Sequence, residues 1–230
     1  MRLTIAMIAF NEEDYIIDAL DSIQRFADEI VIIDGGSVDD TDSLITEWAR
    51  GHKGIDVKYG IIPWPNDFGQ QRQESFNYAT GDWIMRVDSD EVTSREVRVG
   101  VRAILASLPD RCSAVRMRQL NLYPDQDHYA ADCGGWETWP RIWRRRPELQ
   151  WVGQVHEHVM LCMAGQLSEI AEQEVWNWNA NMIHRGWLNR GRRQARENLY
   201  RTMPGSGFVE AGDLTQRQYV IKEVPRVVAG

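Results

Sequence analysis

The sequence lacks several features from which a function is often deduced. No G-x-G-x-x-G follows the first predicted strand and no G-K-[ST] occurs, so neither a Rossmann dinucleotide site nor a P-loop is supported. No apolar run approaches the length of a membrane span. The three cysteines are widely spaced without a C-x-x-C pair, which predicts neither a disulfide framework nor a zinc site. The net charge of −8 argues against a general polyanion binder.

What is present is the composition of a globular α/β protein. Hydrophobic residues make up 43% and charged residues 26% of the 230 residues, which suits one domain with a full core. The apolar N-terminal stretch is short and runs directly into residues 11–14 (NEED), so we interpret it as a first strand and not as a signal peptide. We therefore expect a cytoplasmic protein, with peripheral attachment to the inner membrane face as the alternative.

Apolar runs and helical periodicity alternate along the first half of the chain. Continuous apolar runs predict buried strands at residues 3–9, 30–33, 57–62 and 83–87. Helical spacing predicts helices between them, and Asn11 is expected to cap the first. This series is typical of a doubly wound, mostly parallel sheet with helices on both faces. Later, alternation over residues 114–122 predicts a partly exposed strand, and the long connection 124–140 is interpreted as a functional loop.

Carboxylates gather where the predicted strand 83–87 ends. Asp88, Asp90 and Glu91 stand within four residues at the edge where open α/β sheets bind their ligands. Like charges so close repel one another unless a cation lies among them, and oxygen ligands suit Mg²⁺ or Mn²⁺. The alternative is a solvated strand-to-helix turn, because acidic residues are common at helix N-termini.

Two further residues belong to this predicted edge. Asp34 ends the second strand, where a carboxylate can bind a base or a ribose, but taken alone it is typical of an ordinary Asp-Gly-Gly turn. Arg72 lies between Phe68 and Phe76 on an inward-facing stripe, and a buried guanidinium needs an anion. We expect Arg72 to pair either with an acidic loop or with a ligand phosphate.

Four segments, in this order, resemble the motifs of family 2 glycosyltransferases with a GT-A fold. They are residues 9–13 (AFNEE), 31–41 (VIIDGGSVDDT), 71–73 (QRQ) and 81–91 (GDWIMRVDSDE). Residues 153–157 (GQVHE) and 183–186 (IHRG) are similar to motifs of the bacterial branch that resembles lipopolysaccharide-core transferases. The resemblance covers roughly residues 3–200, and it departs from the commoner pattern at Gln73, where Asn is usual.

The resemblance implies a division of the chain and a donor site. Residues 1–108 would form the nucleotide-sugar-binding half of a GT-A domain, residues 109–204 its smaller mixed acceptor-side half, and residues 205–230 a tail. The implied donor-binding set is Ala9, Phe10, Glu12, Asp34, Asp39, Arg72, Asp88 and Ser89. Within it, Arg72 would approach the diphosphate, and the residues before it would hold the base and the ribose.

The resemblance also implies a metal site and a base. Asp90 would ligate Mg²⁺ or Mn²⁺ directly, with Asp88 beside it, and a histidine would add a nitrogen ligand. His184 is preferred to His156 for this role, although each position also suits an ordinary structural histidine. Glu157 is the expected catalytic base, acting with Asp90, and the alternatives in the long loop are Glu137 and Asp132.

The expected activity is inverting, metal-dependent transfer of one sugar from a UDP-linked donor to a saccharide or lipid-linked saccharide. Single transfer is expected because the Q-x-x-R-W motif of processive synthases is absent. One alternative is that the acceptor is a modified nucleic-acid base, as suggested by the later arginines, which are Arg141, Arg144, Arg145, Arg146, Arg185, Arg190, Arg192, Arg193 and Arg196. The other alternative is a nucleotide-binding protein of this fold without catalysis.

Overall fold

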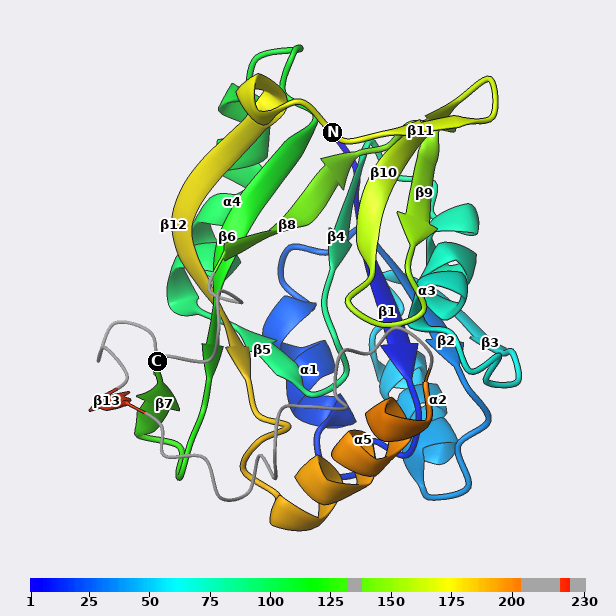
Figure 1. Cartoon of the computed structure of the whole chain (residues 1–230), viewed down its shortest axis with the longest axis vertical. Helices are drawn as coiled ribbons and strands as arrows, with labels where there is room; N and C mark the ends of the chain where they lie inside the picture. The colour runs from blue at the N-terminus through cyan, green and yellow to red at the C-terminus, as the bar shows by residue number, and fades with distance from the viewer. Residues whose placement is uncertain (132–137, 204–219, 224–230) are drawn as a thin grey trace.

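The protein is built around one mixed sheet (Figure 1). The computed structural model describes residues 1–131, 138–203 and 220–223. The eight strands of the sheet lie in the order β3-β2-β1-β4-β8-β6-β12-β5. They are β1 (Leu3–Ala9), β2 (Glu29–Asp34), β3 (Asp56–Ile61), β4 (Trp83–Arg86), β5 (Glu91–Thr93), β6 (Ala114–Asn121), β8 (Thr138–Arg144) and β12 (Val175–His184). Parallel pairing joins β3, β2, β1 and β4, so the predicted parallel half is confirmed.

Helices cover both faces of this sheet. They are α1 (Ile16–Ile23), α2 (Thr41–Gly51), α3 (Phe68–Asn77), α4 (Arg95–Ser107) and α5 (Arg190–Thr202), with a short 3-10 helix η1 (Glu172–Glu174). The largest core cluster joins α1, α2 and α4 to one face of the sheet. On the other face, Phe76 of α3 packs with Ala6 of β1 and Trp151. The predicted α/β architecture, with helices on both faces, is confirmed.

The first strand shows why both faces are covered. Leu3, Ile5 and Met7 belong to the cluster under α1, α2 and α4, whereas Ala6 and Ile8 belong to clusters on the α3 side. Successive side chains of a strand alternate between the two faces of a sheet, so a strand that is apolar throughout is stable only with cover on both. All of β1 is buried accordingly.

The second half of the chain extends the sheet by antiparallel pairing. β8 pairs antiparallel with both β4 and β6, and β12 runs parallel to β6 and antiparallel to β5. β6 lies inside the sheet, yet Arg118 is exposed and Arg116 and Gln119 are half-buried, so the predicted partly exposed strand is confirmed. A second sheet contains β9 (Leu149–Val152), β10 (His158–Met163) and β11 (Gln166–Ser168). A third sheet pairs β7 (His128–Ala130) with β13 (Ile221–Glu223). The division at residues 108 and 204 stays a prediction.

The expected role of Asn11 as a helix cap is wrong. Asn11 has a φ of 55°, and its Oδ1 accepts a hydrogen bond of 2.8 Å from Val38 N. Helix α1 instead begins after Tyr15, which makes no side-chain capping bond. The hydrogen bond between Asn11 and Val38 links the end of β1 to the loop after β2. Asparagine suits the position because its short polar side chain tolerates the left-handed backbone conformation.

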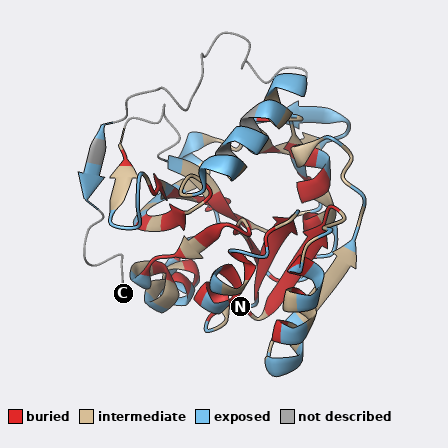
Figure 2. Ribbon diagram, turned by 90° about the horizontal axis from the view of Figure 1, so that it is seen from below, coloured by how far each residue is buried: buried red, intermediate tan, exposed pale blue. Residues whose placement is uncertain are grey.

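Burial follows the layers. Figure 2 shows the strands mostly buried and the outward surfaces of the helices exposed. Among the residues that the structure describes, no helix combines the length and the apolar character needed to cross a membrane.

Candidate active site

The predicted site residues meet at the carboxyl ends of β1, β2 and β4. Ala9 at the end of β1 pairs with Asp34 at the end of β2, and Ala6 pairs with Arg86 at the end of β4. Because the three strands are parallel, the loops that follow them lie at one edge of the sheet. The structure therefore brings Phe10, Glu12, Asp34 and Asp88 to this edge, as predicted from their order in the sequence.

Asp34 organises the loop after β2. Its side chain is fully buried, and Oδ1 accepts hydrogen bonds of 2.7 Å from the backbone N–H groups of both Gly36 and Ser37. Gly36 has a φ of 96°, which favours glycine. The Tyr59 hydroxyl donates to Oδ2 at 3.3 Å. The turn interpretation of Asp34 is thus correct for one carboxylate oxygen, and the second oxygen faces Tyr59.

Asp39 and Phe10 occupy different surroundings at this edge. Burial alone would raise the pKa of Asp39, but hydrogen bonds from the Thr41 hydroxyl and backbone outweigh it and lower the pKa. Thr41 also accepts a bond from Glu12 N at 2.7 Å, which ties the first loop to the second. Phe10 is 49% exposed, and an aromatic ring at such a position offers a face for stacking. Ala9 is buried and accepts a backbone hydrogen bond from Gly35.

Helix α5 contributes a residue whose role at this edge was not predicted from the sequence. The guanidinium of Arg192 forms an ion pair with the Glu12 carboxylate and lies 4.8 Å from the centre of the Tyr15 ring. Tyr200, near the other end of α5, contacts Phe68 with ring centres 5.9 Å apart. The helix therefore lies across the strand ends, from the loop after β1 to the start of α3. Nothing in the local sequence indicated this position.

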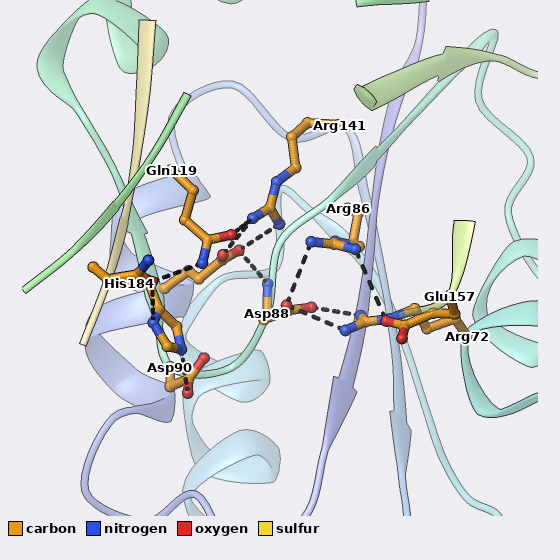
Figure 3. Close-up of polar contacts among 10 residues, drawn as sticks. Arg72, Arg86, Asp88, Asp90, Gln119, Arg141, Glu157 and His184 are labelled. Atoms are coloured by element: carbon orange, nitrogen blue, oxygen red, sulfur yellow. Dashed lines mark hydrogen bonds and ion pairs between the residues drawn. The ribbon is translucent and has the colours of Figure 1, made fainter. Parts of the chain in front are cut away.

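Arg72 and Asp88 form the centre of a charged cluster (Figure 3). Arg72 Nη1 and Nη2 donate to Asp88 Oδ1 at 2.5 Å and Oδ2 at 3.2 Å, and Nε donates to Glu157 Oε1 at 2.7 Å. Burial alone would raise the pKa of Asp88, but Arg72 and then Arg86 hold it well below its usual range. Without a ligand, Arg72 thus pairs with the acidic loop, which was one of its two predicted partners.

Arg86 is a second, largely enclosed guanidinium, 13% exposed, that sequence reasoning missed. Its Nη2 lies 3.8 Å from Asp88 Oδ2 and its Nη1 lies 4.0 Å from Glu157 Oε1, so both contacts are loose. In the described part of the chain, its Nε has no hydrogen-bond partner. Burial, together with repulsion from Arg141 and Arg72, lowers the pKa of Arg86 to about 10. One available signal was a charged residue within the apolar run of residues 83–87.

Asp90 faces His184 and not the Arg72 cluster. His184 Nε2 lies 3.2 Å from Asp90 Oδ2, and both side chains are buried. The other ring nitrogen, Nδ1, makes a hydrogen bond of 2.8 Å with Asn121 Oδ1. Of the two predicted histidines, the structure therefore brings His184 to Asp90. His156 lies in an exposed turn with a φ of 55°, next to Glu157.

The Asp90–His184 pair fits a divalent cation that shares its coordination with a ligand. A carboxylate oxygen and an imidazole nitrogen are suitable ligands for Mn²⁺, and such ions commonly keep water and bind substrate phosphates. Within the described ranges, no group of three or more His, Cys, Asp or Glu side chains has the geometry of a metal site. The predicted set of Asp88, Asp90, His156 and His184 is thus not assembled as one cluster, because Asp88 turns toward Arg72.

The remaining candidates are placed as follows. Ser89 is buried between Asp88 and Asp90. Asp132 and Glu137, the alternative bases, lie outside the described residues. Glu157 lies against Arg72 at the same edge as Asp88.

Among the side chains that the structure describes, the arginines that suggested a nucleic-acid surface do not gather in one place. The side chains of residues 144–146, at the end of β8, bond to oxygens near the beginnings of β4 and β6. Arg185 and Arg192 form ion pairs near the opposite edge, and Arg141 is fully buried. The predicted single basic patch is therefore wrong, since the antiparallel β8 carries its arginines away from α5.

Comparison with known proteins identifies relatives of this site and fold. The family model described as glycosyl transferase family 2 matches residues 4–173. A TPR repeat-containing protein of Synechococcus elongatus is 25% identical over 195 residues, covering 85% of this chain and 44% of that protein. The lipopolysaccharide core biosynthesis glycosyltransferase LpsC of Rhizobium meliloti is 30% identical over 107 residues, covering 46% of this chain and 38% of that protein. The chain thus spans less than half the length of either curated relative.

A solved structure shares the fold. The crystal structure of Staphylococcus aureus TarS 1-349 in complex with UDP-GlcNAc matches with a TM-score of 0.57 and 14% identity. The match covers 87% of this chain and 64% of that one. At this identity the likeness concerns the fold alone, and it confirms the GT-A architecture that the sequence motifs implied.

Proposed function

The chain belongs to glycosyl transferase family 2, and on that premise we propose that it transfers a single sugar from a UDP-linked donor with inversion. The proposed acceptor is a saccharide or a lipid-linked saccharide. The observation that carries this proposal is the pairing of Asp90 with His184 at the strand edge where Arg72 meets Asp88. Asp90 and His184 are suitable ligands for a divalent cation. Arg72 could leave Asp88 for a phosphate, and a cation together with an arginine would neutralise a diphosphate.

The donor nucleotide would bind across the ends of β1 and β2. Phe10 offers a half-exposed ring for the base. Asp34 is buried beneath the loop after β2, so it would shape this surface through Gly36 and Ser37, while Asp39 would contribute a partly exposed carboxylate. Glu12 would complete this surface under α5, held by Arg192. UDP-GlcNAc is the ligand in the TarS complex, so a UDP-linked sugar is the first donor to test.

Asp90 and His184 would hold Mg²⁺ or Mn²⁺, with Asp88 nearby. When bound, such an ion stabilises the charge that develops on a departing diphosphate. Arg72 would add a guanidinium to the same phosphates, because a planar fork of N–H donors matches their oxygens. In the described structure that fork is engaged by Asp88.

Glu157 is the proposed base. A base must be able to accept a proton from the attacking hydroxyl, and Arg72 Nε already occupies Glu157 Oε1 with a hydrogen bond of 2.7 Å. A diphosphate that draws Arg72 toward itself would release Glu157 at the moment the acceptor needs it. Donor binding would thereby prepare the base.

The direct test is thermal unfolding with UDP-, GDP- and dTDP-sugars, each with and without Mn²⁺. A ligand bound only by the folded state raises the melting temperature. We expect a rise with UDP-sugars that depends on Mn²⁺ and disappears in Asp90→Asn. Asp110→Asn, an exposed change in the loop before β6, is the matched control and should retain the rise.

Hydrolysis and transfer then separate catalysis from binding. Slow Mn²⁺-dependent release of UDP is expected from the wild-type chain, whereas Glu157→Gln should keep donor binding and lose sugar transfer. Donor binding without turnover on any saccharide or lipid-linked acceptor would contradict the proposal and favour the non-catalytic alternative.

A further inference from the structure

A row of buried polar side chains leads from β8 to the candidate metal site, and we propose that it determines which nitrogen of His184 carries the proton. The row comprises Arg141, Gln119 and Asn121, and it ends on His184 Nδ1. Its proposed role is to keep Nε2 unprotonated and directed at the cation. The inference rests on the proposed cation at Asp90 and His184, and it concerns residues with no other assigned role.

The row begins at a buried ion pair. Arg141 is fully buried, and its Nη1 and Nη2 donate to the Glu91 carboxylate at 3.0 and 2.7 Å. Nη2 also donates to Gln119 Oε1. Gln119 Nε2 donates to Asn121 Oδ1 at 2.8 Å, and the same oxygen lies 2.8 Å from His184 Nδ1. Figure 3 shows Arg141, Gln119 and His184 in succession above Asp90.

The chemistry of the groups fixes the direction of every bond in this row. Arginine can only donate, so the atom of Gln119 that faces Arg141 must be the amide oxygen. The amide nitrogen of Gln119 then faces Asn121, which must present its own oxygen. An oxygen of Asn121 can only accept, so His184 Nδ1 must carry a hydrogen. Because Arg141 can only donate hydrogen bonds, it determines the tautomer of the His184 ring through Gln119 and Asn121.

The consequence lies on the other side of the ring. With the proton on Nδ1, neutral His184 has a lone pair on Nε2, which lies 3.2 Å from Asp90 Oδ2. Two acceptors this close repel each other unless a cation or a proton lies between them. A histidine whose second nitrogen is fixed by a hydrogen bond is also the usual arrangement of a metal ligand.

The strand register explains why these side chains lie next to one another. Gln119 and Asn121 are two residues apart on β6, so their side chains leave the same face of the sheet. His184 pairs with Asn121 on one side and with Glu91 on the other. The Glu91 carboxylate also accepts a bond of 3.0 Å from Asp88 N, which connects the row to the loop that carries Asp90. Strand register therefore aligns the row with the candidate site.

The substitution Gln119→Glu reverses the row without removing a side chain. The new carboxylate accepts from Arg141 but presents an acceptor to Asn121, whose amide must then turn its nitrogen toward it. His184 Nδ1 loses its acceptor, and we expect the proton to move to Nε2. Asn121→Asp is the conservative counterpart, because a carboxylate there still accepts from both Gln119 and Nδ1. Gln150→Glu, an exposed change on β9, matches the change in charge and is the control.

Two measurements test the proposal. Ring ¹⁵N shifts of metal-free protein, recorded where the imidazole is neutral and assigned with His184→Asn, report which nitrogen is protonated. We expect Nδ1–H in the wild-type chain, Asn121→Asp and Gln150→Glu, and Nε2–H in Gln119→Glu. Titration with Mn²⁺ alone should show an affinity about 10- to 100-fold weaker in Gln119→Glu than in the wild type. Asn121→Asp and Gln150→Glu should show no such loss of Mn²⁺ affinity.

The outcomes separate this proposal from the proposed function. Nε2–H in the wild-type protein would overturn the proposal without any variant, as would an unchanged tautomer in folded Gln119→Glu. A wild-type chain that shows Nδ1–H but binds no Mn²⁺ would contradict the metal site of the proposed function, and the row would stand. Tight Mn²⁺ binding by the wild type and by Gln119→Glu alike would overturn the role of the row in metal binding.

Discussion

The two ends of the parallel strands both hold carboxylates that are at least partly buried, but the partners of these carboxylates differ. Where the strands begin, Glu29 has no exposed surface and accepts hydrogen bonds of 2.7 Å from the backbone and the hydroxyl of Thr80. The Thr4 hydroxyl also donates to Glu29, Lys58 Nζ lies 2.6 Å from Oε1, and Arg2 Nη2 lies 3.7 Å from the same oxygen. Burial alone would raise the pKa of Glu29, but these partners outweigh it and lower the pKa to about 2.

Where the strands end, the carboxylates are matched mainly by other charges. Asp88 and Glu157 share Arg72, while Arg86 approaches both at 3.8 and 4.0 Å. A carboxylate held mainly by neutral donors and one close lysine, with Arg2 farther away at 3.7 Å, has little reason to exchange partners. An arginine shared between two carboxylates can move to a phosphate at small cost. Under the proposed function, the beginning of the sheet contributes stability and its end contributes binding, and the following predictions test this comparison.

The largest expected effect is on activity at the functional end. Asp90→Asn keeps the shape of the side chain but removes the charge that would hold the cation. We expect metal-dependent turnover to fall about a thousandfold, while the free energy of unfolding changes by less than about 1 kcal/mol. Donor hydrolysis and urea unfolding measure the two quantities. A large loss of stability in Asp90→Asn would mean that the carboxylates at the ends of the strands stabilise the fold as Glu29 does where the strands begin.

At the opposite end, Glu29→Gln should act on stability alone. The amide replaces an accepting oxygen by a donor that faces Thr80 or Lys58, so the hydrogen bonds of one oxygen are lost. We expect a loss of about 3 kcal/mol, which corresponds to the lowering of the pKa from 4.5 to about 2. Urea unfolding provides the measurement, with exposed Glu47→Gln as control. Turnover per folded molecule should equal that of the wild type.

The same carboxylate predicts a dependence of stability on pH. Its pKa is lower in the folded state, so its contribution is complete above the unfolded value of 4.5 and is lost as the pH falls through about 2. The difference in unfolding free energy between the wild type and Glu29→Gln should therefore shrink from about 3 kcal/mol toward zero over this range. A difference that stays constant down to this pH would show that the charge of Glu29 does not stabilise the fold.

A smaller effect is expected where α5 meets the functional end. Arg192→Ala removes the partner that orients Glu12, so donor affinity should fall about fivefold, or about 1 kcal/mol. Gln194→Ala, an exposed change on the same helix, should leave the affinity unchanged. Donor titration by calorimetry is the measurement, and equal affinities in both variants would exclude a role for Arg192 in donor binding.

Arg86→Met should have little effect on stability. Its lowered pKa shows that burial and neighbouring arginines disfavour the charged form, so an apolar side chain of similar length should fold about equally well. We expect the free energy of unfolding to stay within about 1 kcal/mol of the wild type, while turnover falls. A loss as large as that of Glu29→Gln would mean that both ends stabilise the protein alike.

Much of the first half of the fold and part of the site were predictable from local pattern. The apolar runs identified the parallel strands, and the position of Asp34 and Asp88 directly after two of them placed both at one edge. The family motifs singled out His184, which the structure pairs with Asp90. The cap at Asn11 was predicted wrongly, because the competing bond to Val38 comes from a distant loop.

The contacts that govern the site depend on residues far apart in the chain. Arg192 reaches Glu12, and Asn121 reaches His184, only because helix packing and strand register bring them together. A side chain's hydrogen-bond partner is a property of three-dimensional neighbours, and no local pattern of apolar or charged residues encodes it.

The sequence by itself determined the parallel strands, the edge at which they end and the carboxylates that follow them, because side-chain periodicity and chain order are local properties. Only the tertiary structure decided that Asp88 turns to Arg72 while Asp90 turns to His184. Two carboxylates two residues apart thereby acquire different partners, since the buried neighbours of each come from different strands and helices.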